Sequence, residues 1–228
     1  MELTKSYRLL DREGEKMKKF ELTAEYVTNI FGKKLFRIKA LVEFGNVKEG
    51  DLGGFVEKES NIDDDGNAWV SGNAQVFGNA QISGNAQVYG NAKVFGNAWI
   101  SGNAQVFGNA WVFGNAWISG NAQVYGNACV AGNVQIYGNA CVAENLDYAI
   151  VGGFGSKQQT ITFFRQKDGS VGAKCGFFYG TLEEFREKVL ETHGESKYAQ
   201  EYLMIADLME LHFAGGCDGN DKDDHSCL

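Results

Sequence analysis

Between residues 66 and 143, small or branched apolar residues alternate with polar or aromatic ones on a six-residue beat. Each unit reads Gly-Asn-Ala-x-Val-x, so its alanine and valine lie two residues apart. In an extended segment such residues point to one side, and the two x positions point to the other. Glycine and asparagine are the residue types that most readily adopt a positive φ, which a sharp corner needs. Each unit therefore predicts a short strand and a corner.

A longer period indicates how these strands are arranged. The branched residue is isoleucine instead of valine at Ile82, Ile100, Ile118 and Ile136, which lie eighteen residues apart. If three units make one turn, each strand stacks on the strand three units earlier, about 4.8 Å away. The sequence thus predicts a mainly β protein built on a triangular parallel β-helix with eighteen residues per coil. The regular repeat is long enough for a little over four coils.

The flanking segments predict two further units. Residues 19–42 alternate well enough to form strands, and Val56 and Ile62 are spaced as in an irregular first coil. After the repeat, Asp168-Gly169 predicts a β-hairpin. A first helix is expected after the capping box of Thr181 and Glu184, with Gly194 as its stop, and a second at about 196–214.

These elements give a predicted division of the chain. It consists of N-terminal strands that cap the β-helix (1–45), the parallel β-helix itself (46–145), a small C-terminal α+β unit of a hairpin plus two helices (146–214), and a disordered acidic tail (215–228).

The outward positions carry three columns of aromatic residues. One face has Phe77, Phe95 and Phe113 together with Trp111, a second has Tyr89, Phe107 and Tyr125, and the third has Trp99 and Trp117 beside a serine column, with Tyr137 above. One interpretation is that stacked rings stabilise the coils. The other is that columns of rings with almost no charge form interaction surfaces. At least one face is then expected to be covered, by the terminal segments, a second copy or a partner.

The motif Ala-x-Val followed by a glycine-containing turn resembles the hexapeptide-repeat signature of left-handed β-helices, whose best-known members are acyltransferases. The stretch "FGNVKEGDLGGFVEKESNI" leading into "GNAWV" is similar to a GNA-repeat group of bacterial and phage proteins that are labelled transferases. This resemblance covers roughly residues 35–143. It implies a left-handed coil, a homo-oligomer with a trimer favoured over a dimer, and an inhibitor-like role in phages.

Composition and charge narrow the choice of partners. The 228 residues include 30 glycines and no proline, with a net charge of −8. The repeat carries a single charged side chain, Lys93, so the charges lie at its ends. An acidic chain argues against nucleic acid, which requires concentrated Lys and Arg. No long apolar run predicts a membrane span, and the N-terminus has no apolar signal core. With five scattered cysteines, we expect a cytoplasmic protein without a disulfide framework.

Catalytic and metal-binding patterns are missing from the repeat. Hexapeptide acyltransferases use a histidine base, but residues 66–143 contain no histidine and no carboxylate. His193 and His212 fall in the last turns of the expected helices, where capping is the simpler role. Cys217, His225 and Cys227 form a cluster whose spacing fits no zinc pattern. We therefore predict no catalytic residue, no metal and no cofactor.

The main hypothesis is a non-catalytic binding or scaffold protein. It would self-associate, or bind a protein partner, through the aromatic faces. Two alternatives stay open. One is an acyl-CoA-dependent acyltransferase whose catalytic residues come from the terminal units. The other is a carbohydrate-binding module that uses the Trp and Tyr columns with Gln and Asn as donors.

Overall fold

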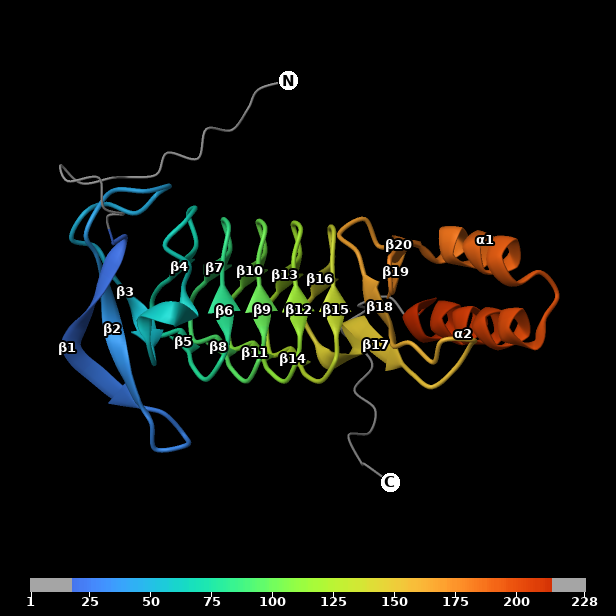
Figure 1. Cartoon of the computed structure of the whole chain (residues 1–228), viewed down its shortest axis with the longest axis horizontal. Helices are drawn as coiled ribbons and strands as arrows, with labels where there is room; N and C mark the ends of the chain where they lie inside the picture. The colour runs from blue at the N-terminus through green and yellow to red at the C-terminus, as the bar shows by residue number, and fades with distance from the viewer. Residues whose placement is uncertain (1–17, 215–228) are drawn as a thin grey trace, which may run out of the picture.

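The computed structural model describes residues 18–214, which form one elongated molecule (Figure 1). A hairpin lies at one end, stacked coils form the middle, and a small sheet with two helices lies at the other end. The first seventeen residues of the predicted N-terminal unit, the predicted tail, and Cys217, His225 and Cys227 fall outside this described part. Neither helix within residues 18–214 is both long enough and apolar enough to span a membrane.

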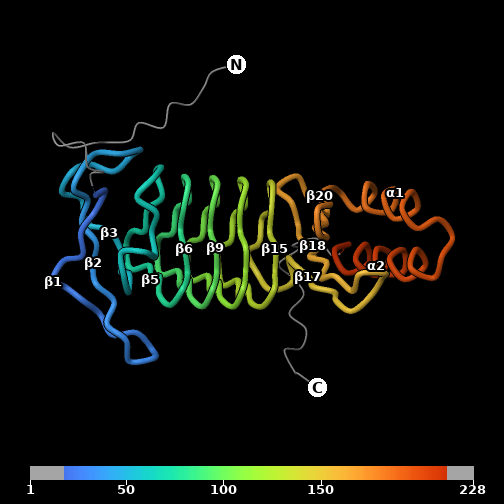
Figure 2. Tube along the Cα trace, in the orientation of Figure 1, coloured from blue at the N-terminus to red at the C-terminus, as the bar shows by residue number. Residues whose placement is uncertain are grey.

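The middle of the molecule is a parallel β-helix of about five coils, visible as regular loops of the trace (Figure 2). Strands eighteen residues apart pair in parallel, so that Trp117 lies opposite Trp99 and Ile118 opposite Ile100. The short strands of the three faces are β5 (Gln75–Val76), β8 (Lys93–Val94), β11 (Trp111–Val112) and β14 (Cys129–Val130); β4 (Trp69–Val70), β7 (Gln87–Val88), β10 (Gln105–Val106), β13 (Gln123–Val124) and β16 (Cys141–Val142); and β6 (Gln81–Ile82), β9 (Trp99–Ile100), β12 (Trp117–Ile118) and β15 (Gln135–Ile136). The predicted stacking by eighteen is confirmed.

The interior of the β-helix is filled by the alanine and the branched residue of each unit. From Ala68 to Val142 these side chains are at most 1 % exposed. The four isoleucines lie in one column, because Ile82 pairs with Ile100 and Ile118 pairs with both Ile100 and Ile136. The two-residue alternation therefore sorts the side chains into a dry interior and an outer surface, as predicted.

The corners use glycine and asparagine in different ways. The unit glycines from Gly66 to Gly138 all have a positive φ, but no asparagine in the described residues does. Asparagine contributes its amide instead. From Asn67 to Asn121, each corner Nδ2 donates to the Oδ1 of the asparagine eighteen residues later, as in Asn85 to Asn103 at 3.0 Å. The expectation of positive φ at both residues is therefore wrong for asparagine. A single left-handed residue is enough to turn the chain.

The N-terminal strands extend one face of the β-helix. Antiparallel strands β1 (Phe20–Thr28), β2 (Lys34–Ala40) and β3 (Leu52–Val56) continue the sheet of β5, β8, β11 and β14. The first coil is irregular, as expected. Val56 pairs with Val76 and Ile62 bridges to Ile82, so this coil is two residues longer than the others. The two additional residues lie between Ile62 and Val70, because Val70 pairs with Val88 at the regular spacing of eighteen. A 3-10 turn, η1 (Glu59–Asn61), precedes them.

The C-terminal unit closes the other end of the β-helix. Four antiparallel strands lie in the order β17 (Tyr148–Val151), β18 (Ile161–Arg165), β19 (Val171–Cys175) and β20 (Phe178–Thr181), after a 3-10 turn, η2 (Asn145–Asp147). β18 lies on the last coil, where the Thr162 hydroxyl accepts a hydrogen bond from the N–H of Gln135 at 3.1 Å. The predicted hairpin at Asp168-Gly169 is confirmed as β18–β19, but β17 and β20 extend it to a sheet.

Two helices follow the sheet, α1 (Leu182–His193) and α2 (Lys197–Ala214). The predicted capping box is present. The N–H of Glu184 donates to the Thr181 hydroxyl at 3.2 Å, and the N–H of Thr181 donates to the Glu184 carboxylate at 2.8 Å. Gly194 ends α1 at a positive φ. The buried side of the helices packs on the four-stranded sheet around Phe163 and Phe185, which makes a second core beside that of the β-helix.

Candidate interaction surfaces

The phenylalanine column stacks as predicted but is covered at one end. The ring centroids of Phe77, Phe95 and Phe113 are 4.8 and 4.9 Å apart with nearly parallel planes. Phe31, at the tip of the β1–β2 hairpin, places its ring 5.9 Å from both Phe77 and Phe95. Phe77 also packs with Leu35 and Phe55 and is only 4 % exposed. Of the coverings expected from the sequence, the terminal segment is the one seen here.

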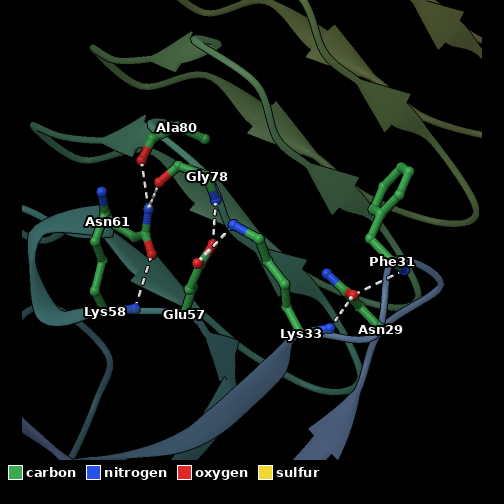
Figure 3. A network of polar contacts seen from close by, with 8 residues as sticks. All are labelled: Asn29, Phe31, Lys33, Glu57, Lys58, Asn61, Gly78 and Ala80. Atoms are coloured by element: carbon green, nitrogen blue, oxygen red, sulfur yellow. Dashed lines mark hydrogen bonds and ion pairs between the residues drawn. The ribbon is translucent and has the colours of Figure 1, made fainter.

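Two polar side chains anchor the hairpin that covers this column (Figure 3). Asn29 accepts hydrogen bonds from the N–H groups of Phe31 and Lys33 at 2.9 and 3.0 Å, which fixes the turn. Lys33 then pairs with Glu57 at 2.8 Å, and the other oxygen of Glu57 accepts the N–H of Gly78 at 2.7 Å. The hairpin tip is thus tied to the first two coils, and Phe31 is held over the rings.

The second column is a stack of half-buried rings. Tyr89, Phe107 and Tyr125 have centroids 4.8 and 5.1 Å apart and planes within a few degrees of parallel. Burial raises the pKa of the Tyr89 phenol. Trp111, on the phenylalanine face, lies under the Lys93 ammonium at 4.4 Å from its ring and edge-on to Phe95. Rings that lie flat on one another expose their edges more than their faces. Most of these contacts therefore fit the interpretation that stacked rings stabilise the coils.

The tryptophan face is different because its most exposed ring adjoins polar groups. Trp99 and Trp117 stack at 5.2 Å, and Tyr137 meets Trp117 edge-on at 5.3 Å. The indole N–H of Trp99 donates to the Ser83 hydroxyl at 3.0 Å, and that of Trp117 donates to Ser101 at 3.5 Å. Trp99 is 44 % exposed, and every other aromatic residue predicted as an interface is more buried.

Beside Trp99 the surface is hollowed where the irregular first coil meets the regular ones. The hollow has a volume of about 400 Å³ and is open to solvent. Beside the ring of Trp99, its polar lining consists of Glu59, Ser60, Asp63, Asp64, Gln81 and Ser83. The sequence alone did not predict this site. The acidic run after Asn61 was visible, but the longer first coil that places it under the tryptophan column was not.

Hydrogen bonds hold the acidic rim in place. Lys19 donates to the backbone carbonyls of Asp63 and Ala68 at 2.5 and 3.0 Å. Asp63 accepts the N–H of Asp65 at 3.0 Å, which fixes the turn. Glu59 pairs with Lys18 at 2.9 Å, and this hydrogen bond raises the pKa of the exposed Lys18 ammonium. Two carboxylates, Asp63 and Asp64, then give the hollow its negative character beside an apolar ring.

The groups needed for catalysis or metal binding lie apart. His193 packs against Tyr198 and Tyr202, and His212 packs against Phe213, at the end of the molecule opposite the hollow. Cys129, Cys141 and Cys175 are free thiols. Residues 18–214 hold no group of three His, Cys, Asp or Glu side chains arranged for a metal ion. Within the described residues, these side chains therefore do not come together into a site that would support the acyltransferase hypothesis.

A second surface was missed by the sequence analysis. In the sequence, the residues of α2 at helical spacing that predict its apolar side are Tyr198, Tyr202, Ile205, Met209 and His212. The structure buries Tyr202, Ile205 and Met209, but leaves Tyr198 and His212 exposed. Three large apolar side chains on the outer side of the helix, Met204, Leu208 and Leu211, are also exposed. The side predicted from the helical spacing is therefore the buried one over Tyr202, Ile205 and Met209, and the second apolar side of α2 is what the sequence did not predict.

A comparison with known protein families identifies the same repeat that the structure shows as coils. The model of the YdcK β-solenoid repeat matches residues 86–102, 104–120 and 122–135. Each of these segments starts eighteen residues after the previous one, so each corresponds to one coil of the structure. The chain is therefore a β-solenoid repeat protein over this part. No curated protein matches the sequence.

Proposed function

We propose that this β-solenoid protein is a non-catalytic binding protein that holds a basic segment of a protein partner in the hollow beside Trp99. The observation that carries the proposal is the position of the most exposed column ring against Asp63 and Asp64. A cation over an indole face gains about 0.5–2 kcal/mol. Carboxylates at the same site add attraction and orient a Lys or Arg side chain.

The solenoid suits this role because its surface is fixed before a partner arrives. Trp99 is held by stacking on Trp117 and by its hydrogen bond to Ser83. The acidic rim is held by Lys19 and by turn hydrogen bonds. A surface that is already ordered loses little entropy on binding. An inhibitor of the kind implied by the phage resemblance would act through the same surface.

Carbohydrate is the second candidate, favoured by Gln81 and Ser83 next to the indole. A sugar ring presents C–H groups to an aromatic face and hydroxyls to amide and carboxylate oxygens. The two candidates differ in charge. A basic segment requires Asp63 and Asp64, whereas a neutral sugar requires mainly the ring.

Titration of the full-length protein with hexalysine and with maltohexaose separates these possibilities, with the heat of binding in isothermal titration calorimetry as the readout. Under the main proposal hexalysine binds, Trp99→Ala weakens it about tenfold, and added salt weakens it further. The double change Asp63→Asn and Asp64→Asn keeps the Oδ1 acceptors of the rim and should weaken hexalysine as strongly. Trp111→Ala, on another face, is the control and should leave binding unchanged. Binding of maltohexaose alone would favour the second candidate, and binding of neither would reject both.

A further inference from the structure

Helix α2 presents large apolar side chains on the side turned away from its core. Its inner side packs on the sheet and on α1 through Tyr202, Ile205, Met209 and Phe213. On the outer side Met204, Leu208 and Leu211 are 72, 56 and 73 % exposed. Their spacing of four and then three residues places them in one row along the helix. We call these three side chains the α2 stripe.

Helix α1 widens the apolar area beside the α2 stripe. Leu190 is 50 % exposed and lies between Arg186 and His193 on α1. Both of these neighbours contact α2, since Arg186 pairs with Asp207 and Glu210 and the His193 ring packs against Tyr202. Leu190 therefore lies on the side of α1 that is turned toward α2. The acidic residues next to the stripe are engaged with Arg186, so their charge is partly neutralised.

The chain's own ends are poor candidates to cover the stripe. The fourteen residues after α2, "GGCDGNDKDDHSCL", contain four aspartates and only one large aliphatic residue, Leu228. The first seventeen residues join the structure at Lys18, which is paired with Glu59 at the far end of the β-helix (Figure 1). Five coils and the C-terminal sheet separate that point from α2. An exposed apolar stripe on an otherwise acidic protein marks a contact site.

We propose that the α2 stripe binds the α2 stripe of a second copy, which makes an antiparallel dimer with its twofold axis near Leu208. In this arrangement each Leu208 meets its counterpart, and Met204 of one copy meets Leu211 of the other. Lys197, which is exposed and pairs with Glu201 of its own helix at 3.5 Å, lies at the start of one helix α2 and is then directed toward the C-terminal end of the other. This pairing sets positive helix ends against negative ones. A single self-complementary row is what a twofold interface requires.

Sedimentation velocity of the full-length protein over a concentration series tests the proposal. We expect a monomer–dimer equilibrium. Leu208→Glu should raise the dimer dissociation constant about a hundredfold, because two like charges would be buried at the axis. Leu146→Glu is the matched control, since this η2 leucine is also exposed, at 68 %, and lies away from α2. It should leave the equilibrium unchanged, and circular dichroism should show both variants folded. A protein that is monomeric at every concentration overturns the proposal.

A cross-link distinguishes the second copy from other occupants of the stripe. In a background in which the native cysteines are replaced by serine, Leu208→Cys should form a disulfide between two copies at the same position, and Leu146→Cys should not. If the Leu208→Cys protein sediments as a dimer but does not form this disulfide, the proposal is overturned. Sedimentation of a protein that lacks residues 1–17 is a further test. If this deletion alone abolishes the dimer, the N-terminal segment occupies the stripe and the proposed pairing is wrong.

Discussion

The corner glycines differ in what an added side chain would meet. At Gly114 a Cβ atom would lie 2.8 Å from the backbone nitrogen of Gly132 in the next coil, whereas at Gly132 it would meet nothing within 4 Å. Both residues have a positive φ, so both would carry the conformational cost of a non-glycine residue. Only Gly114 also carries the steric cost of close stacking.

This difference predicts unequal effects of two alanine substitutions. Gly132→Ala should lower the free energy of unfolding by about 1–2 kcal/mol, which is the cost of the left-handed conformation. Gly114→Ala should lower it by roughly 1–3 kcal/mol more, because the coils must also separate locally. Urea denaturation followed by tryptophan fluorescence measures both values. Equal losses would show that the coils adjust to a methyl group without cost.

Asparagine plays two roles that differ in energy. Asn61 is fully buried and donates to the carbonyls of Gly78 and Ala80 at 3.3 and 2.8 Å, while its Oδ1 accepts the N–H of Lys58 (Figure 3). Asn61→Ala should cost about 2–4 kcal/mol, since it leaves several buried groups without partners. Asn103→Ala removes two exposed hydrogen bonds of a corner ladder, one from Asn85 and one to Asn121, and should cost only about 1 kcal/mol because water replaces both partners. Thermal unfolding of both variants against the unmodified protein provides the comparison.

At the scale of the secondary-structure elements, the β1–β2 hairpin is attached to the coils through Glu57, and the strength of this attachment depends on pH. The pKa of Glu57 is lowered chiefly by the hydrogen bond from Lys33; burial raises it, and the N–H of Gly78 and nearby lysines lower it again. The folded state therefore binds this proton less readily than the unfolded state. The resulting stabilisation is present above the ordinary carboxyl pKa and is lost as the pH falls through the depressed value.

Glu57→Gln should therefore destabilise the protein at neutral pH. The difference in unfolding free energy between the variant and the unmodified protein should shrink as the pH falls below the ordinary carboxyl pKa of about 4.3. Chemical denaturation at a series of pH values measures it. Glu49→Gln, at an exposed turn residue, is the control and should show no such trend. A constant difference at every pH would mean that Glu57 acts only through packing.

The elements with a strong local signal are the ones that could be predicted from sequence. The corner glycines, the isoleucine period and the capping box of Thr181 each reflect chemistry within a few residues or one coil, and the structure confirms them. Strand β17 was missed because Tyr148–Val151 has no turn signal of its own and depends on β18 for its pairing. The left-handed sense of the coil was implied by the resemblance alone and stays a prediction.

At the scale of the molecule, the candidate site was only partly predictable. The columns and their stacked rings follow from the eighteen-residue period. Their exposure does not, because it depends on which segment folds over which face. Phe31 covers Phe77, and the longer first coil brings Asp63 and Asp64 beneath Trp99. Both contacts join parts of the chain whose relative placement no local pattern specifies.

The repeat should tolerate the loss of one whole coil better than the loss of one unit. Deletion of residues 85–102 removes eighteen residues and keeps every column in register. Deletion of residues 97–102 removes six, so that each upper column lies over a different lower one. Val106 would then lie over Ile82 and Ile118 over Val94, which disrupts the packing of the isoleucine column in the core. The shorter deletion should therefore be the less stable protein. Urea midpoints of the two variants test this, and the reverse order would contradict the importance of register.

The uniform rise of the coils has a consequence for what lies at the two ends. Because each coil adds about 4.8 Å along the axis, the number of coils sets the distance between the Trp99 hollow and helix α2. A dimer joined through α2 would place its two hollows at the ends far from the interface, at a separation fixed by that number. Lengthening or shortening the repeat by whole coils would reset the span without altering either end.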